Sequence, residues 1–136
     1  MQINCFDPLK RSPLAAKKIK QVVKKVCRTE KPDWDFELRI IFTDDEQIHV
    51  LNRNYLKHDY PTDVISFPIE EEGSFIEGEI YIGLDRAAEQ AKEYGIAFAI
   101  EILRLIIHGV LHLVGYDDQT ARQRKIMTQK ENEYLG

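Results

Sequence analysis

The segment from residue 97 to 115, AFAIEILRLIIHGVLHLVG, constrains the fold more than any other part of the chain. Its apolar residues fall on nearly every side of a helix, so we expect this helix to be buried. Burial makes its two histidines, His108 and His112, costly unless each finds a polar partner. The segment ends at Gly115, which can adopt the left-handed conformation that terminates helices. The fold must therefore provide partners for two histidines at the end of a buried helix.

His108 and His112 are one helical turn apart, so their side chains project from the same face of the helix. Two interpretations fit this pair. Each histidine can be a core residue that is hydrogen-bonded to a polar neighbour, as single buried histidines usually are. Alternatively, both imidazoles bind one metal ion, for which the i, i+4 spacing suits Zn²⁺. The surrounding Leu, Ile and Val side chains offer few hydrogen-bond partners, and this favours the shared ion.

A third candidate ligand, Asp118, follows Gly115. The spacing H-x-x-x-H-x-x-G-x-x-D matches the layout of metzincin proteases, in which a histidine occupies the last position. A carboxylate also binds zinc, and three protein ligands leave a fourth position open for water, as in catalytic sites. However, Gly109 occupies the place of the glutamate that acts as general base in zinc peptidases. This argues against peptide hydrolysis without excluding it.

The remaining pattern predicts one α+β domain over residues 1–136, a small mixed sheet with helices packed against it and the zincin-like helix at the metal site. Strands are expected at 36–42, 64–67 and 75–82, the last two joined by the acidic loop IEEEGS. Besides 97–115, helices are expected at 14–28 and at about 119–134. Another is expected to begin at a capping box formed by Thr43 and Glu46 and to continue through IHVLNRNYL. A further helix is expected at 85–95, with Asp85 as its N-cap and Gly95 at its end.

Composition narrows the functional classes. A chain of 136 residues with 43% hydrophobic and 31% charged residues is typical of one globular domain. It has no apolar run long enough to span a bilayer and no signal-peptide layout at its start, so we expect a cytoplasmic protein. Cys5 and Cys27 lack metal or redox spacing, and we expect both thiols to be inert. Because the net charge is −4, nucleic acid must bind at a local basic patch. The lysines of 14–28 form a solvated helix face or, alternatively, a surface that faces RNA.

HGVLHLVGYDD, residues 108–118, resembles the signature H-G-x-L-H-L-x-G-Y-D-H of the YbeY family of bacterial endoribonucleases. LNRNYLKHDYPTDVISFP, residues 51–68, resembles that family's L-N-x-x-Y-R-x-x-D-x-P-T-D-V-L-S-F-P, and GEIYI at 78–82 is similar to its G-D-I segment. The three stretches lie in the family's order and spacing. The resemblance therefore covers most of the chain.

The resemblance implies a cytoplasmic, metal-dependent endoribonuclease that cleaves single-stranded RNA in rRNA maturation, at the 3′ end of 16S rRNA, and in ribosome quality control. It implies one Zn²⁺ per chain, held by His108, His112 and a third ligand at position 118. The implied partners are single-stranded RNA or rRNA and the ribosomal proteins or small ribosomal subunit, with no membrane.

Two residues depart from the family pattern. Asp118 replaces the last histidine, which keeps a ligand but adds negative charge. The expected result is weaker Lewis acidity of the bound ion, or a preference for a harder ion such as Mn²⁺. Leu56 replaces the arginine after the tyrosine, which leaves Arg53 and Lys57 as the nearest candidates for binding substrate. The alternative is that both are ordinary surface charges.

Other polar residues near these motifs have two interpretations. Asp117 is an outer partner of the site or an alternative ligand. Asp63 and Ser66 support the metal pocket, or Thr62 and Asp63 cap a turn after Pro61. His58, in a polar loop, is a weaker candidate for substrate contact than for surface solvation, and His49 is expected to be solvated or packed.

Three functions are consistent with the sequence. In the first, a metal-dependent endoribonuclease uses the ion to polarise a phosphoryl oxygen or to supply hydroxide, while RNA offers its own 2′-hydroxyl as nucleophile. The second is a metallopeptidase or other metallohydrolase. The third is a non-catalytic ribosome-assembly factor in which a structural metal fixes the helix end. The ribonuclease is the primary hypothesis.

Overall fold

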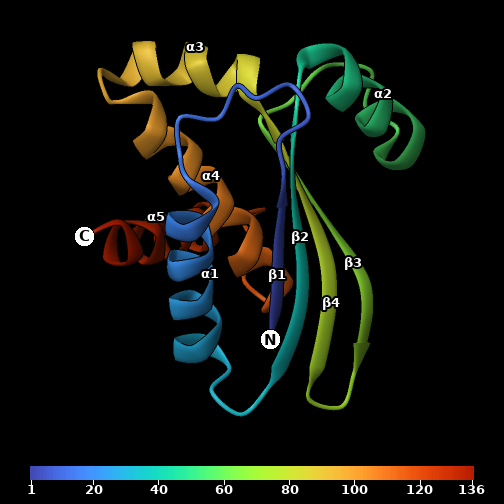
Figure 1. Cartoon of the computed structure of the whole chain (residues 1–136), viewed down its shortest axis with the longest axis vertical. Helices are drawn as coiled ribbons and strands as arrows, with labels where there is room; N and C mark the ends of the chain where they lie inside the picture. Colours follow the sequence, from blue (N-terminus) through green and yellow to red (C-terminus); the bar gives the residue numbers. More distant parts are fainter.

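The structure, a computed structural model, describes residues 1–136 as one four-stranded sheet and five helices (Figure 1). The elements are β1 (Gln2–Phe6), α1 (Ala16–Glu30), β2 (Asp35–Thr43), α2 (Asp45–Leu56), β3 (Val64–Glu72), β4 (Phe75–Gly83), α3 (Leu84–Tyr94), α4 (Phe98–Leu113) and α5 (Ala121–Leu135). The strand order is β1-β2-β4-β3, with β1–β2 and β2–β4 parallel and β4–β3 antiparallel. The predicted α+β class with a mixed sheet is confirmed.

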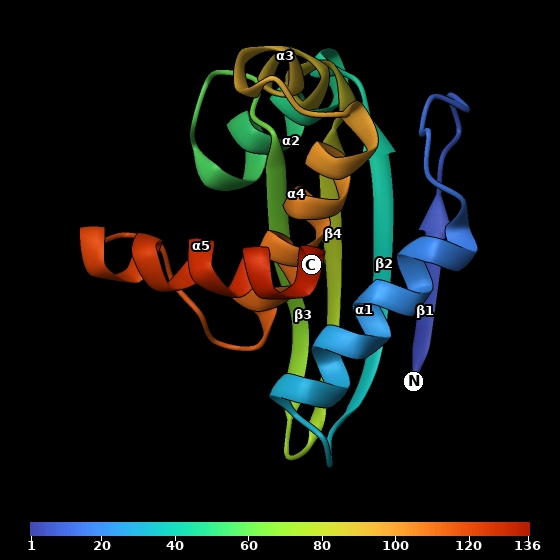
Figure 2. The ribbon, with the colours of Figure 1, turned by 90° about the vertical axis from the view of Figure 1, so that its left-hand side faces the viewer.

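The core lies between one face of the sheet and the helices α1 and α4. Alternate residues of the central strands point into it, among them Phe36, Leu38 and Ile40 of β2 and Ile80 of β4. Figure 2 shows α1, α4 and α5 in front of this face, whereas α2 in Figure 1 lies on the other side of the sheet, at one end. The apolar side chains of α1 are buried, and its lysines are exposed or partly exposed on the opposite face. This agrees with the predicted amphipathic helix, and an RNA-facing role of the lysines stays a prediction.

Helix α4 is buried on most of its surface, as its sequence predicts. It approaches the sheet closely at two glycines. A Cβ atom at Gly109 would lie 2.7 Å from Ile80 Cγ2 and 3.0 Å from Ser66 Oγ, and one at Gly78 would lie 2.8 Å from Leu113 Cδ1. These contacts bring the histidine end of α4 against β3 and β4. No single helix is long and apolar enough to cross a membrane. Only α3 and α4 taken together have the length and composition of a membrane span, and the chain bends by 116° between them.

The β3–β4 hairpin is longer than the sequence predicts. The expected acidic loop is wrong, because Glu70, Glu71 and Glu72 continue β3 and pair with β4 after an irregularity at Pro68. The turn consists of Gly73, with φ of +58°, and Ser74. Consecutive glutamates have low strand propensity, so cross-strand pairing overrides the local preference here.

Strand β1 was not predicted. It is five residues long, and it joins the sheet by parallel pairing with β2 on the other side of the α1 crossover. A short strand with a distant partner has little local signal, since a parallel pair lacks the hairpin turn that marks antiparallel neighbours.

Two predicted helix caps are wrong. Thr43 ends β2 and donates its hydroxyl to the Ile82 carbonyl at 2.9 Å, while the capping box of α2 is formed by Asp44 and Gln47. Asp85 lies inside the first turn of α3, where it accepts from Arg11 and from the Asp45 backbone N–H, both at 2.7 Å. It thus stabilises the start of α2. The prediction for Gly95 is confirmed, since it adopts the left-handed conformation after α3.

Helix α5 packs against the core through Met127 and Tyr134. Met127 and Tyr134 are buried, and the Tyr134 hydroxyl donates to Glu30 at the end of α1. Tyr116 donates to the same carboxylate at 2.7 Å. Burial alone would raise the pKa of Glu30, but these hydrogen bonds and Lys130 lower it below its ordinary value. The ionised Glu30 therefore connects α1, the turn after α4 and α5.

Gly109→Ala should destabilise the protein by about 1–3 kcal/mol, because the added methyl group overpacks the contact with Ile80. The cost should shrink when Ile80 is also replaced by alanine, which removes the nearest contact atoms. Urea unfolding of the two single variants and the double variant measures this coupling. An equal cost of Gly109→Ala in both backgrounds would contradict the proposed contact.

Glu30→Gln should lower stability by about 1–2 kcal/mol near neutral pH, where the ionised carboxylate accepts both tyrosine hydroxyls. Because folding lowers the pKa of Glu30, its contribution is present above the unfolded pKa of about 4.3 and is lost as acid protonates it. The difference from wild type in thermal unfolding should therefore diminish below about pH 4. Glu93→Gln, at an exposed position of α3, is the control and should change little.

Candidate metal centre and the cleft around it

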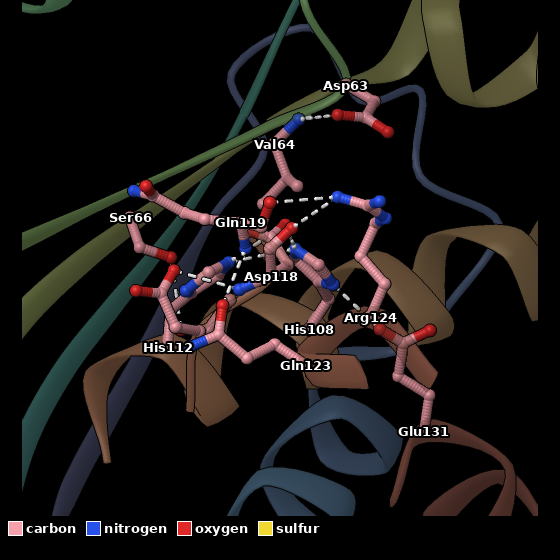
Figure 3. Close-up of polar contacts among 12 residues, drawn as sticks. Asp63, Val64, Ser66, His108, His112, Asp118, Gln119, Gln123, Arg124 and Glu131 are labelled. Carbon is pink, nitrogen blue, oxygen red and sulfur yellow. Dashed lines mark hydrogen bonds and ion pairs between the residues drawn. The ribbon is translucent and has the colours of Figure 1, made fainter. Parts of the chain in front are cut away.

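The turn after α4 returns Asp118 to the face that carries His108 and His112 (Figure 3). The two histidine Nε2 atoms are 3.0 Å apart, and Asp118 Oδ2 lies 3.3 Å from His108 Nε2 and 3.4 Å from His112 Nε2. Gly115 makes the turn with φ of +113°, a conformation that side chains rarely allow. The structure therefore brings the three predicted ligands together.

The donor atoms have the separation that a small four-coordinate ion requires. Ligands at the corners of a tetrahedron lie about 3.3 Å apart when each bond to the ion is about 2.0–2.1 Å. The three observed separations of 3.0, 3.3 and 3.4 Å are close to this value. Three side chains account for three corners and leave one for water or substrate. The cluster can hold a metal ion.

The loop that carries Asp118 is fixed by its neighbours. Asp117 Oδ1 accepts from the Asp118 backbone N–H at 2.8 Å, which makes Asp117 a support for the ligand. From α5, Arg124 Nη1 donates to the carbonyls of Asp118 at 3.3 Å and Gln119 at 3.1 Å. These contacts hold the carboxylate of Asp118 toward the histidines.

A buried chain of charged side chains orients His108 from the opposite direction. Its Nδ1 atom lies 2.7 Å from Glu131 Oε2 of α5, and the other oxygen of Glu131 accepts from Arg104 Nη1 at 3.2 Å. Arg104 also binds both oxygens of Glu101 at 2.8 and 2.6 Å, and Gln90 donates to Glu101 at 2.7 Å. Both carboxylates are almost fully buried. Because Glu131 accepts the Nδ1 proton of His108, Nε2 keeps its lone pair for an ion.

The charges of this network determine its protonation. Burial alone would lower the pKa of His108, but the hydrogen bond to Glu131 and the negative charges of Glu131, Asp118 and Asp63 raise it above its ordinary value. The hydrogen bonds to Glu101 raise the pKa of Arg104 against the opposing effect of burial, so the guanidinium stays charged. A metal ion competes with a proton for His108, and metal affinity therefore depends on pH.

The three candidate ligands lie in a cleft of about 730 Å³ between α4, β3 and the loop after α2. Its lining side chains include four acids, Asp63, Glu71, Asp117 and Asp118, and no lysine or arginine. An anionic substrate would be repelled from such a cleft unless a bound cation compensated the charge.

Other predicted residues are placed as follows. Asp63 and Ser66 both line the cleft; Asp63 caps the Val64 backbone N–H at 2.8 Å and Ser66 donates to the Gly109 carbonyl at 3.0 Å. Arg53 and Lys57 are exposed and do not line the cleft, whereas Leu56 and His58 do. A role of Arg53 and Lys57 in substrate binding stays a prediction.

The histidine of α2 and the cysteines lie outside the cleft. His49 Nε2 is 2.8 Å from Asp59 Oδ1, which fits the expected packed or solvated role. Cys27 is buried, and burial raises the pKa of its thiol to about 12, which fits the expected inertness. Cys5 is half-buried and unpaired.

Position 109 also bears on the class of hydrolase. Its Cα faces β3 and β4, where a Cβ atom would meet Ile80 and Ser66. A glutamate in this position would therefore be directed into the sheet. The general base of zinc peptidases has no counterpart here.

Sequence reasoning missed Glu131, Arg104 and Glu101. Glu101 and Arg104 did carry a signal, because they are two charges one turn apart in an otherwise apolar helix, where burial requires pairing. Glu131 is one of many polar residues of α5, and only the docking of that helix brings it to His108.

Glu131→Gln should weaken metal binding about 10–100-fold, as removal of a carboxylate behind a ligating histidine typically does. Titration of Zn²⁺ or Mn²⁺ in competition with a chelator measures the Kd. Glu133→Gln is the matched control, because Glu133 lies on the same helix, is exposed and pairs only with Lys130 at 3.6 Å. Equal affinities of the two variants, both shown to be folded by circular dichroism, would contradict the role of Glu131.

Comparison with known proteins identifies the family of the chain. The family model described as Endoribonuclease YbeY matches residues 8–136. A protein named Endoribonuclease YbeY from Chloroherpeton thalassium is 43% identical over 126 residues, which cover 93% of this chain and 88% of that protein. One of the same name from Pelotomaculum thermopropionicum is 42% identical over 123 residues, covering 85% and 81%.

A solved structure supports the fold as well. The solution structure of a Thermotoga maritima protein matches with a TM-score of 0.69 and 31% identity, covering 99% of this chain and 87% of that one. The matches of sequence and fold extend over nearly the whole length, and the chain therefore belongs to the YbeY family.

Proposed function

We propose that this protein cleaves single-stranded RNA at a Zn²⁺ ion held by His108, His112 and Asp118, and that its substrates include rRNA, at the 3′ end of 16S rRNA. As a member of the YbeY family, the chain is a metal-dependent endoribonuclease. Family membership does not identify the ion, the RNA that is cleaved or the residues that bind the ion, and we propose these here.

One observation carries the proposal: three donor atoms 3.0–3.4 Å apart converge in a cleft. Two imidazoles and one carboxylate are a donor set typical of catalytic zinc, although Mn²⁺ accepts the same set. The absence of lysine and arginine from the lining makes a bound cation the main source of positive charge for a phosphate in the cleft. RNA binding as well as cleavage should then require the ion.

The bound ion would supply Lewis acidity, which polarises a phosphoryl oxygen and lowers the pKa of water. The residues of the chain provide orientation. Glu131 holds the Nδ1 proton of His108, and Asp117 and Arg124 hold the loop of Asp118. No side chain at position 109 can act as a general base, so RNA, which carries a nucleophilic 2′-hydroxyl, suits this cleft better than a peptide.

The proposal extends to partners and location. Single-stranded rRNA is bound in the cleft, and the small ribosomal subunit or its proteins are the expected partners. A cytoplasmic location, where rRNA is processed, completes the proposal.

Asp118→Ala should remove one of three ligands and reduce metal content from about one ion per chain to well below that, with RNA cleavage falling at least 100-fold. Elemental analysis of protein purified without a histidine tag gives the first number, and cleavage of a labelled single-stranded RNA gives the second. Asp33→Ala, an exposed acid outside the cleft, is the control and should match wild type.

The same measurements separate the other functions. Metal loss with unchanged cleavage of single-stranded RNA would contradict the proposed site. Chelator-sensitive cleavage of an unstructured protein, with none of RNA, would indicate a peptidase. A metal-dependent melting temperature without any cleavage would indicate an assembly factor with a structural ion.

A further inference from the structure

The cleft contains a third histidine that the metal centre does not use. His58 lies in the loop between α2 and β3 and lines the same cleft as His108 and His112. Its ring is parallel to that of Tyr60, with the centroids 5.5 Å apart and an angle of 9° between the planes. Tyr60 Oη lies 3.3 Å from His58 Nδ1. Both side chains are exposed. His58 lines the cleft, and Tyr60 stacks on it from outside the lining.

A buried side chain fixes the backbone beneath this pair. Asn52 is 2% exposed. Its backbone carbonyl accepts from the His58 backbone N–H at 3.1 Å, and its side-chain Nδ2 donates to the Tyr60 backbone carbonyl at 2.9 Å. Between them, Asp59 is held by His49 at 2.8 Å. The loop is thus attached to α2 at residues 58, 59 and 60. The two rings are therefore presented to solvent by a backbone that is held in place.

An exposed aromatic pair next to a phosphate-cleaving centre fits an unpaired nucleobase. Bases stack on aromatic side chains, and such stacking provides affinity with little dependence on sequence. A base within a double helix already has both faces covered, whereas an unpaired base has a free face. Leu56, which also lines the cleft, stands where the family motif has an arginine. No lysine or arginine lines the cleft, so the chain must hold its substrate there by other contacts.

We infer that His58 and Tyr60 form a stacking platform that binds one unpaired base of the RNA and thereby holds the neighbouring phosphate near the metal centre. The inference rests on the proposed function and names the residues that make this chain select single strands. Both residues lie outside the candidate metal ligands, so the platform would act on binding of the RNA rather than on binding of the ion.

Binding of a non-cleavable oligonucleotide tests the platform. The probe is a fluorescent 2′-O-methyl oligouridylate of about eight nucleotides, a length typical of single-strand sites, bound to the Zn²⁺-loaded protein and followed by anisotropy. A set of these probes carries an abasic sugar at each position in turn. For wild type, one position should lose affinity about tenfold, the loss expected when one stacked base is removed.

The variant His58→Ala/Tyr60→Ala should bind the intact probe about tenfold more weakly and lose nothing further at the sensitive abasic position. Phenylalanine at both positions keeps the ring faces and should restore binding. Phe6→Ala removes an exposed aromatic ring on β1, at the opposite edge of the sheet, and should match wild type. In cleavage of single-stranded RNA, KM should rise about tenfold in the double alanine variant with little change in kcat.

Several results would overturn the inference. An abasic penalty that is the same in wild type and in the double alanine variant means that the base binds elsewhere. Cleavage of RNA by wild type, with an unchanged KM in the variant, contradicts the platform and leaves the proposed function intact. Absence of RNA cleavage by metal-loaded wild type contradicts the proposed function, and the platform with it.

Discussion

The close contact of α4 with the β3–β4 hairpin determines where the metal centre lies. Gly109 lets the helix backbone approach Ile80 and Ser66, and Gly78 accepts the end of Leu113 from the same helix. A larger residue at either glycine would move the helix away from the sheet. The two histidines would move with it relative to β3. The position of the ligands thus depends on two residues that contribute no chemistry.

A second constraint comes from charges inside the protein. Glu101 and Glu131 are buried around Arg104, and burial of such groups is costly unless all of them are paired. The pairing is complete here, and it ends at the Nδ1 atom of His108. Replacing the network with apolar residues would often be neutral for stability. The network is better explained by the orientation that it gives to His108, a candidate metal ligand.

Much of this structure follows from local sequence patterns. The buried helix, the lysine face of α1 and the convergence of His108, His112 and Asp118 could be predicted, because helical spacing and the glycine turn place them without knowledge of distant parts. The acidic end of β3, strand β1 and Glu131 could not be predicted. Each depends on a partner far away in the sequence: β4, β2 and His108 respectively. The caps at Thr43 and Asp85 were misplaced because several neighbouring residues can cap, and tertiary contacts select among them.

The hydrogen bond between Glu131 and His108 joins the metal centre to α5, and α5 is joined to α1 through Tyr134 and Glu30. Binding of an ion at His108 would therefore be thermodynamically linked to docking of α5, with a linkage of the same size in both directions. A bound ion favours the docked helix, and a docked helix favours the ion. Any event that loosens α5 at its far end, away from every ligand, would lower the occupancy of the metal centre. Metal content would then report on the integrity of the whole helical layer.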